Sequence, residues 1–168
     1  MPNMGSLVST HNTRLLMEDK VQQSQGCNCL DGPTTCPLDP AECKKNSVIY
    51  VASVSTQSNT EHYTGLTGDT FKKRWYKHTS DFENEKEKNS TTLSAHVWKL
   101  KEEGKPYTIK WDIMDRASTF NPVNRKCRLC LKEIFYIMFK PESATLNSRN
   151  ELYNTCRHRK QKLLNPKK

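Results

Sequence analysis

The alternation of apolar and polar residues along the chain predicts a small sheet. Residues 48–54 are mostly apolar and β-branched, and a second short strand is expected over residues 61–66, behind a polar break at residues 57–59. These two strands lie close enough in sequence to form a hairpin. From Tyr107 to Ile113 apolar and polar side chains alternate, as in a third, half-buried strand. The pattern favours an α+β fold with a small three-stranded antiparallel sheet flanked by helices.

Two helices are expected between the second strand and the third. Residues 67–69 supply a turn and an N-cap candidate, and residues 70–78 follow with helical spacing. Residues 81–89 are expected to form a charged loop. Ser90 or Thr91 can then cap the second helix. Its apolar stripe consists of Leu93, Val97 and Leu100, flanked by Trp98.

The strongest helical pattern runs from Asn124 to Lys140, where Pro141 ends it. Its apolar face is expected to consist of Cys127, Cys130, Leu131, Ile134 and Met138. Glu133 lies at the flank of this face. A carboxylate in that position can be held by the core and still reach a cleft.

Four polar side chains are expected to converge next to the hairpin. Tyr50 and Tyr63 fall on adjacent strands, so their hydroxyl groups can approach one another. Arg74 and His78 are four residues apart on the first helix and therefore share one side of it. Two phenols, a guanidinium and an imidazole can thus meet in one site.

Charge is distributed unevenly along the 168 residues. Residues 1–46 carry a net charge of −1, whereas residues 47–168 hold 23 basic and 13 acidic side chains, a net of +10. A positive field of this size favours a polyanionic partner. A hydrophobic content of 34% indicates a small core that metal binding can help to stabilise. No apolar run approaches the ~20 residues of a membrane span, and no signal peptide is visible.

Seven cysteines fall into two groups. The first group is a knot within residues 27–46, interrupted by residues that favour turns, which can close on one structural zinc ion. Disulfides and unligated thiols are the alternatives. The cysteines of this knot are Cys27, Cys29, Cys36 and Cys43.

The second group offers three thiolates and one imidazole, which would pin the end of the chain to the last helix through a second zinc ion. Cysteines buried in a core are the alternative, and His96 is an alternative fourth ligand. The expected ligands are Cys127, Cys130, Cys156 and His158.

The chain carries two tyrosine motifs, of which the first reads Val48-Ile49-Tyr50 and the second Tyr63-Thr64-Gly65. They resemble the motifs of GIY-YIG endonucleases, with departures from the family pattern at Val48 and Thr64. That family places an arginine on the following helix, then a metal-binding glutamate on a later helix and an asparagine. Arg74, Glu133 and Asn147 match these positions in order.

The wider pattern is similar to the endonuclease of Penelope-like retroelements, from about Met1 to His158. It adds to the nuclease core the cysteine knot, residues 93–98, Trp111, residues 146–149 and the second cysteine group. In that family the nuclease follows a reverse transcriptase in one polypeptide. The resemblance therefore implies nicking of target DNA to prime reverse transcription, with a reverse transcriptase upstream.

The resemblance also implies roles for individual residues. Glu133 would hold a catalytic magnesium or manganese ion, and Arg74 would clamp the scissile phosphate. Tyr50 or Tyr63 would orient or deprotonate the attacking water, with His78 as partner in proton transfer. Asn147 would fix the site by hydrogen bonding. The basic residues expected to contact DNA are Lys72, Lys73, Lys77, Arg149, Arg157, Arg159 and Lys160.

Four regions follow from these patterns: a linker over residues 1–26, the zinc knot over 27–46, the nuclease domain over 47–158 and a basic tail over 159–168. The expected location is intracellular, and nuclear when the protein acts on DNA. Two alternatives remain open. One is a zinc-containing DNA-binding module whose nuclease site is inactive, and the other is a repair or restriction nuclease of the same fold outside any mobile element.

Overall fold

The computed structural model describes residues 36–38, 42–121, 123, 126–148, 156 and 158. The chain divides into two compact units, Met1–Cys43 and Lys44–Lys168. The second unit carries all the strands and all three α-helices of the described residues, and its fold is α+β. Among these residues, no helix has both the length and the apolar character needed to span a bilayer.

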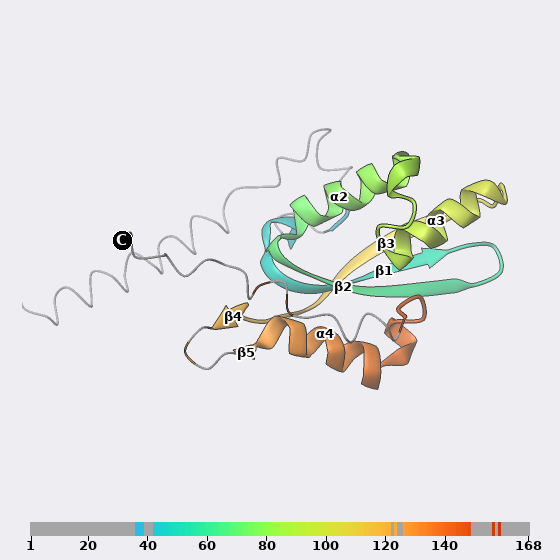
Figure 1. Ribbon diagram of the computed structural model, residues 1–168. Helices are drawn as coiled ribbons and strands as arrows, with labels where there is room; N and C mark the ends of the chain where they lie inside the picture. The colour runs from blue at the N-terminus through green and yellow to red at the C-terminus, as the bar shows by residue number, and fades with distance from the viewer. Residues whose placement is uncertain are drawn as a thin grey trace, which may run out of the picture. The chain divides into compact units, whose positions relative to one another are not determined.

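Three antiparallel strands form the sheet of this unit, as the alternation in the sequence predicts (Figure 1). They are β1 (Asn46–Ser55), β2 (Thr60–Thr70) and β3 (Thr108–Arg116), in the order β2-β1-β3. The expected hairpin joins β1 to β2, and its turn is closed by a 2.8 Å hydrogen bond from Thr56 N to Asn59 O. Tyr50 pairs with Gly65 and Ala52 pairs with Tyr63, so both tyrosines lie on adjacent strands.

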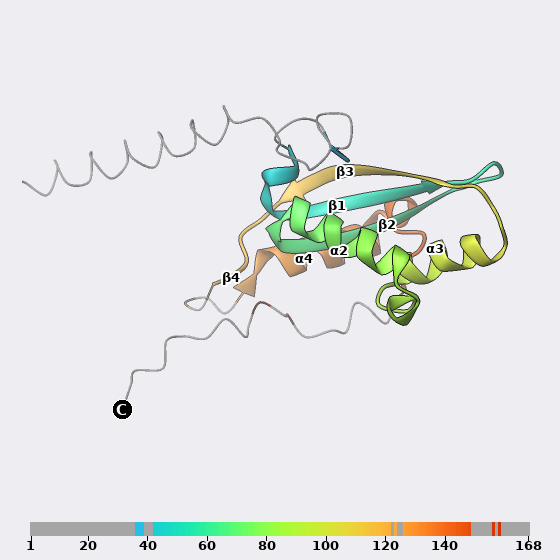
Figure 2. The same ribbon diagram turned by 90° about the horizontal axis from the view of Figure 1, so that it is seen from above.

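Helices cover both faces of the sheet. α2 (Phe71–Glu83) and α3 (Thr92–Glu102) lie on one face and α4 (Arg128–Phe139) on the other (Figures 1 and 2). Residues of β1 alternate between these faces, so Tyr50 packs edge-on against Phe71 of α2, whereas Ile49 packs with Leu129 of α4. Because both faces are covered, β1 is buried almost along its length.

The first helix is longer than the sequence pattern predicts. β2 continues to Thr70, whose side chain caps α2 by accepting a hydrogen bond from Lys73 N, and α2 then runs to Glu83. The segment expected as a charged loop is therefore mostly ordered into this helix and a 3₁₀ turn at Glu85–Glu87. Within this segment Asp81 is buried, and its backbone carbonyl accepts a hydrogen bond from the Trp98 indole at 3.0 Å.

The second helix, α3, matches its sequence pattern. Thr91 is the N-cap, and its side chain accepts from Ser94 N. The stripe of Leu93, Val97 and Leu100 is buried. Gly104 follows the helix with a φ of 63°, a conformation that suits glycine after a helix end.

The last helix, α4, differs from its pattern in start and in face. It begins at Arg128, because Lys126–Cys127 (β5) instead pairs with Phe120–Asn121 (β4). Leu129 is fully buried, whereas Leu131 and Met138 are each 55% exposed. The expected apolar face was wrong for these two residues, since the helix turns Leu129, Cys130 and Tyr136 toward the sheet instead. Phe135 and Phe139 are also exposed.

This choice of face can be tested with two matched substitutions on α4. Leu129→Ala removes a fully buried side chain and should lower the free energy of unfolding by about 2–5 kcal/mol. Leu131→Ala removes an exposed one and should change it by less than about 0.5 kcal/mol. Urea unfolding of both variants measures the difference. A larger loss for Leu131→Ala would show that the sequence pattern gave the correct face.

Candidate active site and metal centre

The hydroxyl group of Tyr50 joins the first strand to the first helix. Tyr50 is completely buried, and its Oη lies 3.0 Å from Arg74 Nε and 2.8 Å from His78 Nε2. The guanidinium can only donate, so the hydroxyl accepts from Arg74 and can give its own proton to His78. The sequence spacing correctly places Arg74 and His78 on one side of α2.

Gly65 makes room for this arrangement. A Cβ added at Gly65 would lie 2.5 Å from Tyr50 Oη and 2.9 Å from a ring carbon of Tyr63. Any side chain there would force both phenols to move, because contacts below 3.0 Å are essentially never made by real Cβ atoms. The glycine of the second tyrosine motif is therefore the place where the two tyrosines meet.

Arg74 lies beside both phenols. Burial tends to lower the pKa of Arg74, but interactions with Tyr50 and then Tyr63 outweigh it, so the pKa is raised and the group stays charged. The side chain is thus held beside both phenols as a permanent cation.

His78 is buried among rings. Its imidazole lies 5.4 Å from the ring of Trp111 and stacks on Phe82 at 6.0 Å. Burial, and after it the charge of Arg74, lowers the pKa of His78 to about 3. His78 Nδ1 is the one buried side-chain polar atom without a hydrogen-bond partner in the described part of the chain. His78 is consequently a neutral group that orients Tyr50.

Asn147 holds the outer edge of β2. Its side chain accepts from Thr64 N at 2.8 Å and donates to Thr64 O at 2.9 Å. Leu146 N also donates to His62 O at 2.9 Å, so the segment after α4 continues the sheet edge like a short extra strand. Asn147 therefore fixes the backbone next to Tyr63, which agrees with a role in hydrogen bonding within the site.

Tyr63, Arg74 and Glu133 meet at one cavity. These residues, from β2, α2 and α4, all line a cavity of about 310 Å³. Lys77, Asp81, Glu87, Ser90 and Thr91 line it as well, and so do three residues of the second cysteine group. Tyr50, His78 and Asn147 are not among the lining residues. The six expected catalytic residues thus divide into three that border the cavity and three that do not.

The lysines expected on α2 point to solvent or to neighbouring acids. Lys73 Nζ lies 3.4 Å from Asp69, and Lys77 Nζ lies 2.7 Å from the buried Asp81. Lys72 Nζ lies 5.8 Å from the centre of the Tyr76 ring. Only Lys77 of these three lines the cavity. The side chains of Lys73 and Lys77 remain more than half exposed, so the pairs stay accessible to a competing anion.

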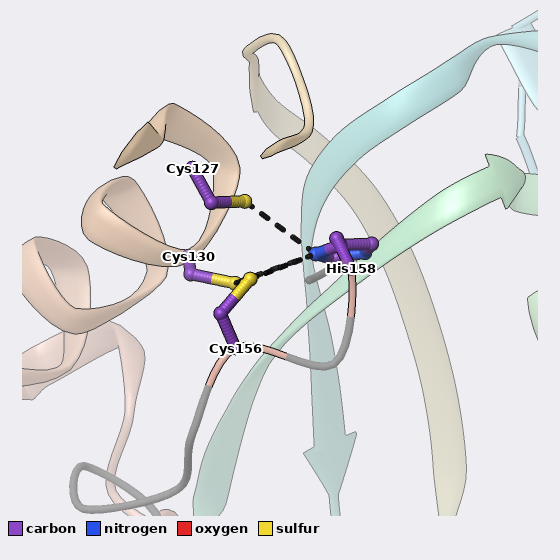
Figure 3. Close-up of side chains that lie close together, drawn as sticks. All are labelled: Cys127, Cys130, Cys156 and His158. Carbon is purple, nitrogen blue, oxygen red and sulfur yellow. Dashed lines mark hydrogen bonds between the residues drawn. The ribbon is translucent and has the colours of Figure 1, made fainter. Parts of the chain in front are cut away.

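The second cysteine group is assembled as the sequence predicts. Cys127 and Cys130 at the start of α4 meet Cys156 and His158, and their ligand atoms all lie within 4.8 Å of one another (Figure 3). His158 Nδ1 lies 3.5 Å from Cys127 Sγ, 3.4 Å from Cys130 Sγ and 3.8 Å from Cys156 Sγ. Cys130 Sγ and Cys156 Sγ are 3.4 Å apart.

These distances suit a tetrahedral zinc ion. Bonds of about 2.3 Å to sulfur and about 2.0 Å to nitrogen put tetrahedral ligands roughly 3.5–3.8 Å apart. Without a cation, burial and the neighbouring thiols raise the pKa of the Cys130 thiol, so three sulfurs packed this closely need a positive charge to ionise. The Cys₃His cluster could therefore hold a zinc ion.

Gly68 gives His158 its place against β2. A Cβ at Gly68 would lie 3.0 Å from His158 Nε2. The imidazole therefore turns Nδ1 toward the thiols and Nε2 toward the strand. Neither Gly65 nor Gly68 was singled out from the sequence as a site residue, although a glycine inside a strand is a recognised signal of a close approach.

Some expected site residues lie elsewhere or outside the described part. His96 is on α3, where its Nδ1 lies 3.6 Å from Glu61, so it is not part of the described cluster. Of the first cysteine group, Cys36 is half-buried and Cys43 is buried. Six residues fall outside the described residues: Cys27, Cys29, Arg149, Arg157, Arg159 and Lys160. The expected linker over residues 1–26 and the basic tail do so too.

Comparison of the chain with models of known protein families, with curated proteins and with solved structures finds no match. The assignment of a function therefore rests on the residues themselves, on their geometry and on the motifs that they form.

The burial of a neutral His78 predicts a pH dependence of stability. Its pKa is about 3 in the folded protein and near 6.5 in the unfolded chain, so the unfolded chain binds the extra proton between these values. The contribution of neutral His78 to the free energy of unfolding is fully present above pH 6.5 and is lost as the pH falls toward 3. Between pH 7 and pH 5, wild type should lose about 2 kcal/mol more than His78→Gln, which stays neutral. Urea unfolding at both pH values measures this, and equal losses would contradict a buried neutral imidazole.

Proposed function

We propose that the chain is a metal-dependent DNA endonuclease of the GIY-YIG type. One observation carries the proposal. Tyr63, Arg74 and Glu133 come from three separate elements and line one cavity, in the chain order of the family that the motifs resemble. A phenol, a guanidinium and a carboxylate around one space can orient water, bind a phosphate and hold a metal ion, which are three functions that serve hydrolysis of a phosphodiester.

Glu133 suits a magnesium or manganese ion that keeps most of its water shell. It is a carboxylate on the wall of a cavity of about 310 Å³, which leaves space for water ligands. Such an ion, when bound, stabilises the negative charge that develops on the phosphate and the leaving oxygen. Glu133 is the expected protein ligand, on a helix whose buried residue Leu129 fixes it to the sheet.

Arg74 would bind the scissile phosphate. Its side chain is held by Tyr50 at 3.0 Å and by Tyr63, and it lines the cavity, where its planar guanidinium can pair with phosphate oxygens. Tyr63 borders the cavity and would orient the attacking water. Tyr50 keeps the guanidinium in place. With a pKa of about 3, His78 is too weak a base to store a proton from the attacking water, so its role is to orient Tyr50.

The wider pattern supports a place in a Penelope-like retroelement. In this role the enzyme nicks target DNA, and the new 3′ end primes a reverse transcriptase in the same polypeptide. The Cys₃His cluster would hold structural zinc that ties Cys156 and His158 to the helix that carries Glu133. A second zinc in the knot of residues 27–46 remains part of the proposal.

Cleavage of supercoiled plasmid tests the proposal directly. With magnesium or manganese, the wild type should produce nicked circles. Glu133→Gln and Arg74→Ala should each lower the rate at least about 100-fold, because each removes a charge that stabilises the transition state. Glu142→Gln, which alters an exposed carboxylate just after α4, should cut like the wild type.

Two results would contradict the proposal. If folded wild type binds DNA but never cuts it with either ion, the chain is the inactive zinc-containing binding module. If Glu133→Gln cuts as fast as Glu142→Gln, the catalytic metal lies elsewhere. A plasmid-nicking enzyme whose gene lacks an upstream reverse transcriptase would instead be a repair or restriction nuclease of this type.

A further inference from the structure

Two of the three clustered thiols face the cavity of the proposed nuclease. Cys130 and Cys156 both line it and are half-buried. Cys127 is 6% exposed, packs with Ile49 and Leu129, and is not among the lining residues. A small solute that enters the cavity therefore reaches Cys130 and Cys156 before Cys127.

The same two sulfurs are already close to each other. Cys130 Sγ and Cys156 Sγ are 3.4 Å apart, and a disulfide needs about 2.05 Å. Cys156 belongs to the segment after Asn147 rather than to α4, so closing the gap does not require two positions on one rigid helix to approach. Cys127 is the N-cap of α4 and Cys130 lies in its first turn, so these two cysteines are held at the same helix end.

We propose that Cys130 and Cys156 are a redox-sensitive pair through which hydrogen peroxide switches the nuclease off. One thiolate attacks the peroxide and gains one oxygen atom, and sulfenic acid and water result after one proton is taken up. The second thiolate then attacks the sulfenic sulfur and releases a second water after another proton is taken up. Two thiolates, one peroxide and two protons thus give one disulfide and two waters. The two sulfurs together lose two electrons, and the peroxide takes them up.

Oxidation would remove two of the four ligands from the zinc ion, which then dissociates. His158 would lose the zinc ion that links it to the cysteines and holds it against Gly68. The part of the cavity lining formed by His158 and Glu133 would then lose its fixed geometry. Cys130 is one helical turn from Glu133 on α4, so the carboxylate would shift with it. The effect on cleavage rests on the proposed nuclease function, whereas the disulfide and the zinc release do not.

The experiment uses the full chain, purified without chelator, with reductant removed, and hydrogen peroxide as the oxidant. Zinc release is followed with a chromogenic chelator and plasmid nicking is assayed in parallel. Disulfides are mapped after trypsin digestion. Trypsin cuts after Lys126, Arg128, Lys132, Arg149 and Arg157, so the three cysteines fall in three different peptides. Each possible disulfide therefore has its own mass.

The Cys130–Cys156 disulfide should form first, with zinc release rising in step, and nicking should fall at least about tenfold. Dithiothreitol with added zinc should reduce the disulfide and restore both zinc binding and plasmid nicking. Cys127→Ser should still form the same disulfide, whereas Cys156→Ser should form none of this mass. Preferential pairing of Cys127, or loss of zinc with all three cysteines reduced, would overturn the inference. A chain that never nicks plasmid refutes the proposed nuclease function. The disulfide and zinc measurements still decide whether Cys130 and Cys156 are a redox-sensitive pair.

Discussion

A buried hydroxyl group is the constraint on which the candidate site depends. Tyr50 Oη lies inside the protein, where an unpaired polar group costs on the order of 1–3 kcal/mol, so it needs its partners Arg74 and His78. Those two hydrogen bonds tie α2 to β1, and Arg74 lines the cavity as well. Gly65 is what lets the phenol lie so close to β2. The site is therefore preorganised by the core rather than by the substrate.

β2 connects the two chemical centres of the domain. Gly65 receives the Tyr50 ring, and three residues later Gly68 receives the imidazole of His158. On the outer edge of the same strand, Asn147 holds both backbone groups of Thr64. A metal ion in the Cys₃His cluster would therefore act on the strand that carries Tyr63 and on the helix that carries Glu133, and the stability of the cluster would be coupled to the geometry of the cavity.

The periodicity of neighbouring residues predicts the elements whose structure is set by local sequence. The hairpin, β3, the cap at Thr91 and the stripe of α3 follow from neighbouring residues, and the Cys₃His cluster follows from ligand chemistry. The face of α4 does not, because Leu131 has the right spacing but the sheet contacts Leu129 instead. The last turn of α2 also goes beyond the local pattern, and there Trp98, 17 residues away, donates to the backbone carbonyl of Asp81. Such long-range contacts leave no local signal.

Which of the six expected catalytic residues line the cavity also depends on tertiary structure. The sequence brings Tyr50 and Tyr63 forward as equals, yet only Tyr63 borders the cavity, because β1 is central and β2 lies at the edge of the sheet. The same argument applies to His78, which the resemblance makes a partner in proton transfer but whose burial near Trp111 and Phe82 lowers its pKa to about 3. Depth within the fold decides the role of each group.

The central claim is that Glu133 binds a divalent metal ion inside the cavity that Tyr63 and Arg74 line. Paramagnetic broadening of NMR signals by manganese measures this most directly, because it reports which nuclei lie near the ion without requiring catalysis. The account predicts that the methyl signals of Leu66 and Ile134, both cavity residues, broaden first, and that Glu133→Gln removes the effect. Broadening that spares these two signals, or that persists unchanged in Glu133→Gln, would contradict it.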